Sequence, residues 1–319
     1  MLLPHAVIWM FSGGLMVLAA GMVSGQDYPN KPIRIVTSGL GGGTDFVARL
    51  IAEGISGPLG QSVVVENRAN ITGAEIGASA TPDGYTLVVQ GQALWIGPLL
   101  QKLSYDPVKD FSPITLTDRS PGLLSVHPSL PVTSVKELIA LAKAKPGQLN
   151  YASTAAGSAG HLAGELFKAM AGVNIVWVPY KSMAVAVTDL LSSRVQMMFT
   201  SPSPVAAHIN SGRLKALAVA TAQPSPLLPG LPTVAATGLP GYEAASITVV
   251  FAPAKTPASI INRLNRESVR VLSTEVAKKK IFSIGAEAVG SSPQEAAAAI
   301  KSDMAKYGKV IKDAGIKVD

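Results

Sequence analysis

The sequence predicts an α/β protein with two lobes, each built on a mostly parallel sheet. Short β-branched runs alternate with helical patterns along the chain, which is typical of parallel sheets. Two turns rich in glycine and hydroxyl residues, 39–45 and 151–158, each follow a strand and lead into a helix. The strand and helix pattern restarts near residue 123, which indicates a second lobe.

The first lobe begins with a strand over residues 32–37 that ends at the glycines of the first turn. Apolar side chains between residues 46 and 51 share one face of the helix that follows. Residues 63–66 and 85–89 are apolar runs bounded by turn residues, and they are predicted to be buried strands.

The second lobe repeats the alternation. Its predicted strands span residues 123–127, 149–153, 175–178, 195–199 and 217–221, and its predicted helices span 135–145, 159–170 and 184–191. A proline-rich stretch at 224–229 then leads to a strand at 247–251, which carries the chain back to the first lobe before helices rich in Ala and Lys end it. We therefore expect lobe 1 to comprise residues 26–124 plus 248–319, with lobe 2, residues 125–247, inserted between them.

Composition excludes several classes of function. Apolar residues make up 48% of the chain and charged residues 15%, as in a globular protein with a large core. The net charge is +7, but Lys278–Lys280 is the only tight basic cluster, and it has no interleaved aromatics, so nucleic-acid binding is not expected. The chain has no cysteine, which excludes thiol catalysis, zinc–thiolate sites, disulfides and a lipoprotein anchor.

The amino terminus predicts export. Residues 1–26 contain no Lys, Arg, Asp or Glu, residues 6–23 are mostly apolar, and small residues precede Gln26. This pattern predicts a signal peptide over residues 1–25 and a periplasmic location, although the usual basic flank is missing. A membrane anchor is the alternative, because the apolar run approaches the length of a spanning helix.

The first turn offers backbone amides at a helix N-terminus, where an anion is stabilised. Its candidate ligand-binding residues are Gly39, Gly41, Gly42, Thr44 and Asp45. Asp45 either caps its helix or meets a hydroxyl or ammonium group of the ligand. The glycines resemble the start of a dinucleotide fingerprint, but Thr44 occupies the third glycine position and the turn has no phosphate-loop lysine.

The second turn supplies Ser158 as a candidate. Ser158 has the position of a helix N-cap, so its hydroxyl bonds backbone amides or a ligand oxygen. Residues 156–160 also differ by one substitution from a nucleophile elbow, with Asp189 and His208 following in triad order. An exported serine hydrolase using Ser158 is therefore the enzymatic alternative.

Other candidates lie where strands end or helices begin. His161 follows Ser158 and either packs or contacts the ligand, and Trp95 is either a core residue or a wall of the pocket. The remaining candidates are Gln90, Gln92, Thr200 and Ser201. The four histidines lack metal-ligand spacing, so no metal or cofactor is expected. Hydrogen bonds to a charged group contribute roughly 1.5–3 kcal/mol each, so a few neutral donors suffice for micromolar binding of a carboxylate.

Ten short motifs follow one another along the chain, at residues 28–34, 41–45, 63–68, 82–86, 105–107, 127–131, 149–153, 161–167, 178–181 and 239–243. In this order they resemble the Bug family, the periplasmic solute receptors associated with tripartite tricarboxylate transporters. The similarity covers essentially the whole chain after the signal.

The resemblance implies a two-lobed type II periplasmic-binding-protein fold with a hinge and an interlobe cleft. It implies a receptor that holds a small carboxylate between the first turn and the second, and it adds Ala152, Ser153 and Thr154 of the second turn as ligand-binding positions. We expect a monomer that is not an enzyme. The partner would be the membrane permease of the transporter or a sensor kinase. Two departures bear on the ligand: Thr37–Leu40 lacks the family's usual aromatic, and Thr200–Ser201 stands where relatives place an acidic or amide residue, which leaves a cationic group fewer partners.

Overall fold

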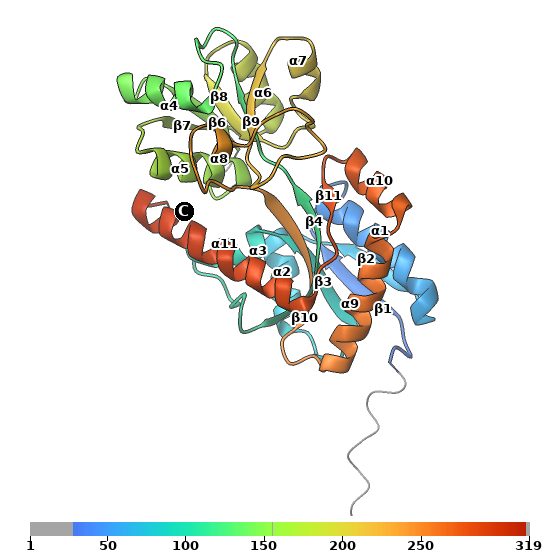
Figure 1. Ribbon diagram of the computed structural model, residues 1–319. Coiled ribbons are helices and arrows are strands. Elements are labelled where there is room, and N and C mark those ends of the chain that lie inside the picture. The colour runs from blue at the N-terminus through green and yellow to red at the C-terminus, as the bar shows by residue number, and fades with distance from the viewer. Residues whose placement is uncertain (1–27, 155, 317–319) are drawn as a thin grey trace, which may run out of the picture.

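The computed structural model describes residues 28–154 and 156–316. The expected signal peptide and its cleavage site lie outside these residues. Within them, the chain forms an α/β fold with two sheets that lie in separate lobes (Figure 1). The first sheet draws its strands from both ends of the described chain, and the second sheet draws its strands from the middle.

The first sheet has six strands in the order β11-β4-β10-β3-β1-β2. Their bounds are β1 Ile33–Thr37, β2 Val63–Asn67, β3 Thr86–Gly91, β4 Phe111–Ser120, β10 Ser246–Pro253 and β11 Glu287–Ala288. The second sheet has five strands in the order β7-β6-β8-β5-β9. They are β5 Leu123–Val126, β6 Asn150–Ser153, β7 Val176–Pro179, β8 Met197–Thr200 and β9 Lys215–Val219.

The expectation of mostly parallel sheets is wrong for part of each sheet. β1 pairs in parallel with β2 and β3, but β10 runs antiparallel to β3 and β4, and β11 runs antiparallel to β4. In the second sheet, β6 is parallel to β7 and β8, whereas β5 is antiparallel to β8 and β9. β5 and β10 each follow directly on a passage between lobes, where the chain enters a sheet from the opposite end.

Helices cover both faces of the first sheet. α1 (Gly43–Leu59), α9 (Ala258–Leu272) and α10 (Glu275–Ser283) contribute to one apolar cluster, and α2 (Asn70–Ser79), α3 (Ala93–Leu100) and α11 (Pro293–Ala314) contribute to another. The alternation pattern did not reveal α2, which is rich in small and polar residues. Its glycines permit close packing, since a Cβ at Gly77 would lie 2.3 Å from a methyl of Val88.

The second sheet is flanked by shorter helices. These are α4 (Val135–Ala144), α5 (Ala159–Ala171), α6 (Met183–Leu191), α7 (Ala206–Asn210) and α8 (Val234–Thr237). Serine hydroxyls cap the three longer ones: Ser134 accepts from the amide of Glu137, Ser158 from that of His161 and Ser182 from that of Val185. These caps set where each helix begins next to its preceding strand.

The chain passes between lobes twice, and the two passages lie side by side. The first joins β4 to β5 through Gly122, and the second leads from β9 into β10. Ala220 donates to the carbonyl of Gly122 at 2.7 Å, and Ala244 donates to the carbonyl of Ala220 at 2.7 Å. A Cβ at Gly122 would lie 3.0 Å from the carbonyl oxygen of Ala244, so the glycine allows this approach. The expected lobe boundary after residue 124 falls inside β5, whose partners are in the second sheet.

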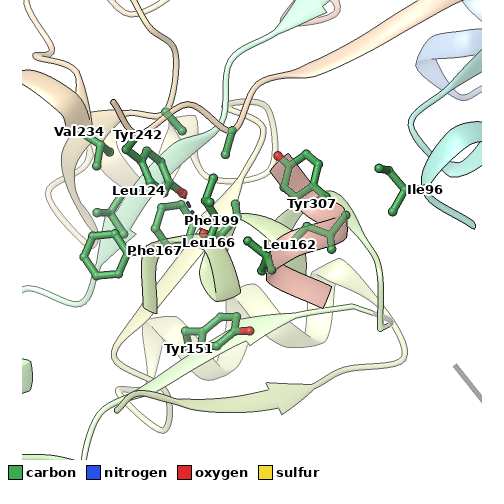
Figure 2. Close-up of a cluster of buried hydrophobic side chains, with 14 of the residues drawn as sticks. Ile96, Leu124, Tyr151, Leu162, Leu166, Phe167, Phe199, Val234, Tyr242 and Tyr307 are labelled. Atoms are coloured by element: carbon green, nitrogen blue, oxygen red, sulfur yellow. Dashed lines mark hydrogen bonds between the residues drawn. The ribbon is translucent and has the colours of Figure 1, made fainter. Parts of the chain in front are cut away.

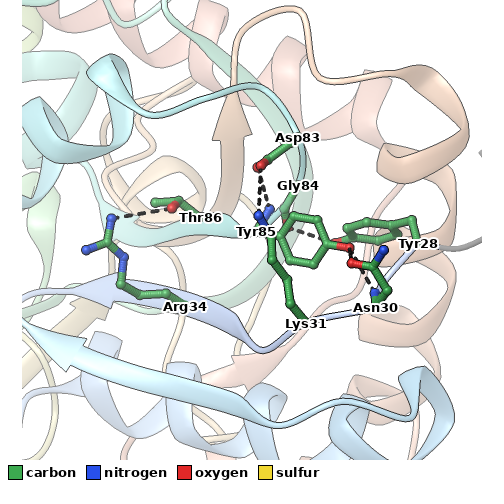
Figure 3. Close-up of polar contacts among 8 residues, drawn as sticks. All are labelled: Tyr28, Asn30, Lys31, Arg34, Asp83, Gly84, Tyr85 and Thr86. Carbon is green, nitrogen blue, oxygen red and sulfur yellow. Dashed lines mark hydrogen bonds and ion pairs between the residues drawn. The ribbon is translucent and has the colours of Figure 1, made fainter. Parts of the chain in front are cut away.

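Two of the family-like motifs serve the fold by contacting each other (Figure 3). The hydroxyl of Tyr28 donates to the carbonyl of Gly84 at 2.8 Å, and the amide of Asn30 donates to the hydroxyl of Tyr85 at 2.9 Å. Lys31 lies 3.5 Å from Asp83. Gly84 has a φ of 81°, a conformation that favours glycine. These residues anchor the start of the described chain.

An aromatic cluster links the second lobe to the returning segment (Figure 2). Tyr242 is 1% exposed and packs against Phe167 and Phe199 with ring centroids 6.1 and 6.0 Å away. Its hydroxyl donates to the carbonyl of Ala163 at 2.8 Å. The same apolar cluster includes Trp95 in the first lobe, so the core continues from one lobe into the other.

Candidate functional site

A pocket of about 240 Å³ lies where the second lobe meets the two passages. Its lining comes from the first passage, from the second turn and the start of α5, from the start of α6, from the end of β8 and from the second passage. The lining residues are Ser120, Pro121, Gly122, Thr154, Ser158, Ala159, Gly160, Ala163, Met183, Phe199, Thr200, Ser201, Ala244 and Ser246.

The N-terminus of α5 is part of this pocket. Ser158 is its N-cap, with the hydroxyl 3.4 Å from the amide of His161, and Ala159 and Gly160 form the first helical positions. A Cβ at Gly160 would lie 2.5 Å from the carbonyl oxygen of Phe199, so glycine lets the helix start lie against the end of β8. The first amides of a helix and its dipole stabilise an anion placed there.

The pocket's polar groups are hydroxyls. Thr200 is 7% exposed and its hydroxyl lies 3.6 Å from the sulfur of Met183, and the hydroxyl of Ser120 donates to the carbonyl of Gly285 at 3.0 Å. None of the lining residues, all within the described ranges, is ionisable. The expected candidates Thr154, Ser158, Thr200 and Ser201 are therefore brought together around an uncharged pocket.

The candidates Ala152, Ser153 and His161 do not line the pocket. Ala152 is buried and Ser153 is 1% exposed, with its hydroxyl accepting from Nε1 of Trp177 at 2.7 Å. His161 is 2% exposed and stacks on Trp177 with 4.0 Å between ring centroids. Its Nδ1 accepts from the amide of Gly157 at 3.0 Å, and burial lowers its pKa below the ordinary value. These contacts give Ser153 and His161 a role in shaping the turn.

The first turn lies in the other lobe and does not line this pocket. Gly39, Gly41 and Gly42 are exposed. Gly42 caps α1 without a side-chain hydrogen bond, and within the described ranges the amides of Gly43 and Thr44 have no acceptor. The hydroxyl of Thr44 bonds that of Ser38. The turn therefore presents helix amides of the kind that bind anions.

Asp45 holds the first turn in place. It is 4% exposed, and its carboxylate accepts from the amide of Gly41 at 2.9 Å and from Nδ2 of Asn67 at 2.8 Å. Arg49 lies 3.0 Å away. Burial raises the pKa of this carboxyl, but the bonds from Asn67, Gly41 and Arg49 outweigh burial and leave the pKa below its ordinary value. Asn67 belongs to a family-like motif, and its role was not evident from sequence.

Gln90 and Gln92 lie near the end of β3. Gln90 is 1% exposed and donates to the carbonyl of Asn70 at 2.9 Å, while its Oε1 has no partner among the described residues. Gln92, the N-cap of α3, donates to Asp303 at 2.8 Å and thereby joins the start of α3 to α11. Trp95 is fully buried and packs against Phe251, which assigns it to the core.

The structure does not form the catalytic triad that the serine-hydrolase alternative requires. Asp189 accepts from the hydroxyl of Tyr180 at 2.9 Å and pairs with Arg194 at 3.1 Å. In the described part of the chain, no hydrogen bond links Ser158 to His208 or His208 to Asp189. Residues 28–154 and 156–316 contain no cluster of metal-ligating side chains.

Several pocket residues were missed by sequence reasoning. Met183, Ala244 and Ser246 line the pocket from α6 and the second passage, and Pro121 and Gly122 line it from the first. A short apolar run resumes after each passage, but nothing in the sequence shows that the two passages adjoin. Separately, no helix within residues 28–154 and 156–316 has the length and apolar character needed to cross a membrane.

Comparisons with known proteins agree with this architecture. The model of the tripartite tricarboxylate transporter family receptor, TctC, matches residues 47–316. Protein BugT of Bordetella pertussis is 34% identical over 96% of this chain and 97% of its own length.

Solved structures extend the comparison. The R. palustris protein Rpa4515, solved with adipate, is 40% identical with a TM-score of 0.74, covering 91% of this chain and 99% of that one. MatC from Rhodopseudomonas palustris, solved with bound malate, is 28% identical with a TM-score of 0.70, covering 89% of this chain and 100% of its own. The fold is therefore the two-lobed fold of periplasmic solute-binding proteins. The chain belongs to the tripartite tricarboxylate transporter family of receptors, together with the Bug proteins.

Proposed function

We propose that this receptor captures a small carboxylate between its lobes in the periplasm and delivers it to the permease of a tripartite tricarboxylate transporter. The observation that carries the proposal is the uncharged pocket at the N-terminus of α5, lined by Ser158, Gly160, Thr200 and Ser201. Helix amides and hydroxyls supply donors to a carboxylate without requiring a basic side chain.

The relatives support the chemical class. Rpa4515 was solved with adipate and MatC with malate, and both of these ligands are carboxylates. The pocket volume of about 240 Å³ is below the roughly 300–1,000 Å³ typical of sites for drug-sized ligands. A small ligand is therefore favoured.

Two lobes allow binding to drive closure. The second turn and the passages form the pocket, while the amides of Gly43 and Thr44 lie on the first lobe. We propose that closure brings these amides onto the ligand, with the hinge at the passages near Gly122 and Ala244. Contacts made by both lobes exist only in the closed state, so the ligand shifts the population towards closure. A sensor kinase that docks on the closed state is the alternative partner.

A thermal-shift screen tests the proposal. The mature protein, which we expect to begin at Gln26, is heated with aliphatic and aromatic carboxylates and with the matching amides. A ligand that binds the folded state raises the unfolding midpoint by mass action. We expect stabilisation by carboxylates of one class and none by their amides. Equal stabilisation by acid and amide would contradict a carboxylate site.

A further inference from the structure

Helix α10 packs one face on the first lobe and exposes the other to water. Ala277 and Ile281, one turn apart, are buried in the apolar cluster that α10 shares with α1 and α9. Figure 1 shows α10 at the outer edge of that lobe, beside β11. On the outward face, Val276 is 63% exposed and Phe282 is 48% exposed. This short helix therefore holds two large apolar residues at the surface.

Three consecutive lysines lie around these apolar residues. Residues three or four positions apart are neighbours on the surface of a helix. Lys278 and Lys279 therefore lie next to Phe282, and Lys279 and Lys280 lie next to Val276. All three lysines are exposed. The apolar surface of α10 is thus flanked by ammonium groups on long, flexible stems.

Carboxylates engage these lysines only weakly. Lys278 pairs with Glu275 at 2.9 Å, and Lys280 lies 3.8 Å from Glu53 on α1. Within residues 28–154 and 156–316, Lys279 has no carboxylate at ion-pair distance. Because ion pairs on an exposed surface contribute little, the ammonium groups remain available to other anions.

Arginines of α9 extend the positive charge. Arg266 and Arg270 both contact Glu267, at 3.3 and 3.1 Å, so this carboxylate offsets only one of them. Arg270 also donates to the carbonyl of Gly54 on α1 at 2.8 Å, next to the Glu53 that Lys280 approaches. The cations of the two helices therefore meet at the same part of α1. We call this surface the basic patch, which comprises Arg266, Arg270, Val276, Lys278, Lys279, Lys280 and Phe282.

The positive charge of the chain is concentrated in these two helices. α9 and α10 together hold six of the 27 Lys and Arg residues but only two of the 20 Asp and Glu residues. α11 is longer and holds four lysines, but it also holds three carboxylates and is nearly neutral. The basic patch thus combines a local excess of cations with exposed apolar side chains.

This combination fits the interface of an anionic lipid bilayer. Basic side chains are attracted to anionic headgroups, and aromatic or aliphatic side chains enter the boundary with the acyl chains. Lysine stems can lie along apolar surface while the ammonium group stays at the headgroups. An acidic protein surface would pair with the lysines, but it would also need a pocket shaped for Phe282. A bilayer accepts that side chain without a matching shape.

We propose that the basic patch binds the anionic surface of a lipid bilayer, with Phe282 and Val276 entering the acyl boundary and the lysines meeting the headgroups. Binding of this kind would hold the receptor at the membrane that contains its transporter. The inference goes beyond the proposed function, because none of the patch residues lines the pocket.

Partition into lipid vesicles tests the proposal. The protein from Gln26 is used, so that the apolar stretch at residues 6–23 cannot contribute. We expect the protein to sediment with vesicles that mix phosphatidylglycerol and phosphatidylcholine, to be released as salt is added, and to stay in solution with phosphatidylcholine alone. Absence of binding to the mixed vesicles at low ionic strength would overturn the proposal.

Charge reversal at one lysine locates the binding surface. A basic residue near an anionic membrane raises partition by about fivefold, so Lys279→Glu should weaken it by roughly twentyfold. The matched control is Lys301→Glu, which makes the same change at an exposed position of α11, among the helices of the other apolar cluster. We expect the control to bind almost as the parent protein does. Equal weakening by both variants would overturn the assignment, because net charge alone would then explain binding.

Phe282→Ser tests the apolar part of the contact. Withdrawing an aromatic side chain from an apolar environment should weaken partition by about tenfold. The control is Val108→Ser, which removes an apolar side chain that is 65% exposed in the loop before β4. Partition of Phe282→Ser equal to that of the control would overturn insertion of α10 into the bilayer.

Two further measurements separate this proposal from its neighbours. Stabilisation by carboxylates should persist in Lys279→Glu and Phe282→Ser, so a failure of membrane binding and a failure of the proposed function are distinguishable. A protein with an acidic surface is the other occupant. Binding to native membrane vesicles that is lost after protease treatment, without binding to pure lipid vesicles, would overturn the lipid assignment in favour of that partner.

Discussion

At the scale of single residues, burial and hydrogen bonding decide which of the candidate side chains are free to meet a ligand. Asp45, Ser153 and His161 have the polar chemistry of a binding site, yet each is nearly buried and bonded within the protein. Thr200 and Ser201 carry only hydroxyl groups, but they line the pocket. Side-chain type alone does not separate these two groups.

Asp45→Ala is expected to lower the stability of the unliganded protein. The substitution leaves the amide of Gly41 without an acceptor, at a cost of about 1–3 kcal/mol. It also removes one of the two acceptors of Asn67 Nδ2, which still donates to the carbonyl of Ser38. Thermal unfolding of the variant measures the loss. Glu53→Ala is the control, because Glu53 is an exposed carboxylate on the same helix with a long 3.8 Å contact to Lys280. Similar midpoints for the two variants would contradict a positioning role for Asp45.

The pKa of Asp45 also gives a pH dependence. The pKa is lowered in the folded state, so the stabilisation is fully present above the unfolded value of about 3.9. It is lost as the pH falls through the folded pKa. The difference in unfolding midpoint between the parent protein and Asp45→Ala should therefore narrow below about pH 4.

For Asp118 we expect the opposite dependence of stability on pH. Burial raises its pKa to about 6, while bonds from Thr117 and Thr248 partly offset that rise. The folded state thus binds this proton more tightly than the unfolded state, and stability contributed by Asp118 falls as the pH rises from about 4 to about 6. Each tenfold change in proton affinity corresponds to about 1.4 kcal/mol. Asp118→Asn should raise the unfolding midpoint at pH 7.5 and flatten this dependence; an unchanged pH profile would contradict the assignment.

At the scale of elements, the positions where helices begin depend on glycines and serines that can be recognised in the sequence. The turns before α1 and α5 were predicted, and each leads into its helix as expected. α2 and β4 were not recognised, because α2 is poor in large apolar residues and β4 mixes buried apolar and polar positions. Their packing partners lie far away in the sequence, so the local sequence pattern did not indicate either element.

Gly160→Ala tests the contact between α5 and β8. The added Cβ meets the carbonyl oxygen of Phe199, so the helix start must move away from the strand end. Such overpacking costs roughly 1–3 kcal/mol, and we expect carboxylate affinity to fall as well. Gly57→Ala is the matched control, because its Cβ would meet nothing within 4 Å. Midpoint and affinity are measured for both, and a stable Gly160→Ala variant with full affinity would contradict the geometry.

At the scale of the whole molecule, the two lobes share part of one apolar core. The cluster that holds Trp95 on the first lobe also holds Tyr151 and Phe167 on the second, and Tyr242 joins them from the returning passage. α11 contacts α3 and β4 of the first lobe and α5 of the second. The lobes are therefore coupled by packing as well as by the passages.

This coupling predicts cooperative unfolding. We expect a single calorimetric transition in which the van't Hoff and calorimetric enthalpies agree, as for a two-state unit. Tyr242→Phe removes the hydroxyl bond to Ala163 and keeps the ring, so it should shift the whole transition rather than split it. Two separated transitions in the parent protein would show that the lobes unfold independently.

The sequence by itself determined the fold class, the two glycine and hydroxyl turns and the family, because these depend on local periodicity, turn chemistry and motif order. Only the tertiary structure decided the antiparallel strands, the place of Met183 and Ala244 in the pocket, and the internal bonding of Asp45 and Ser153. These features arise from contacts between segments distant in the chain. Burial and hydrogen-bond partners are properties of that packing, and no local pattern encodes them.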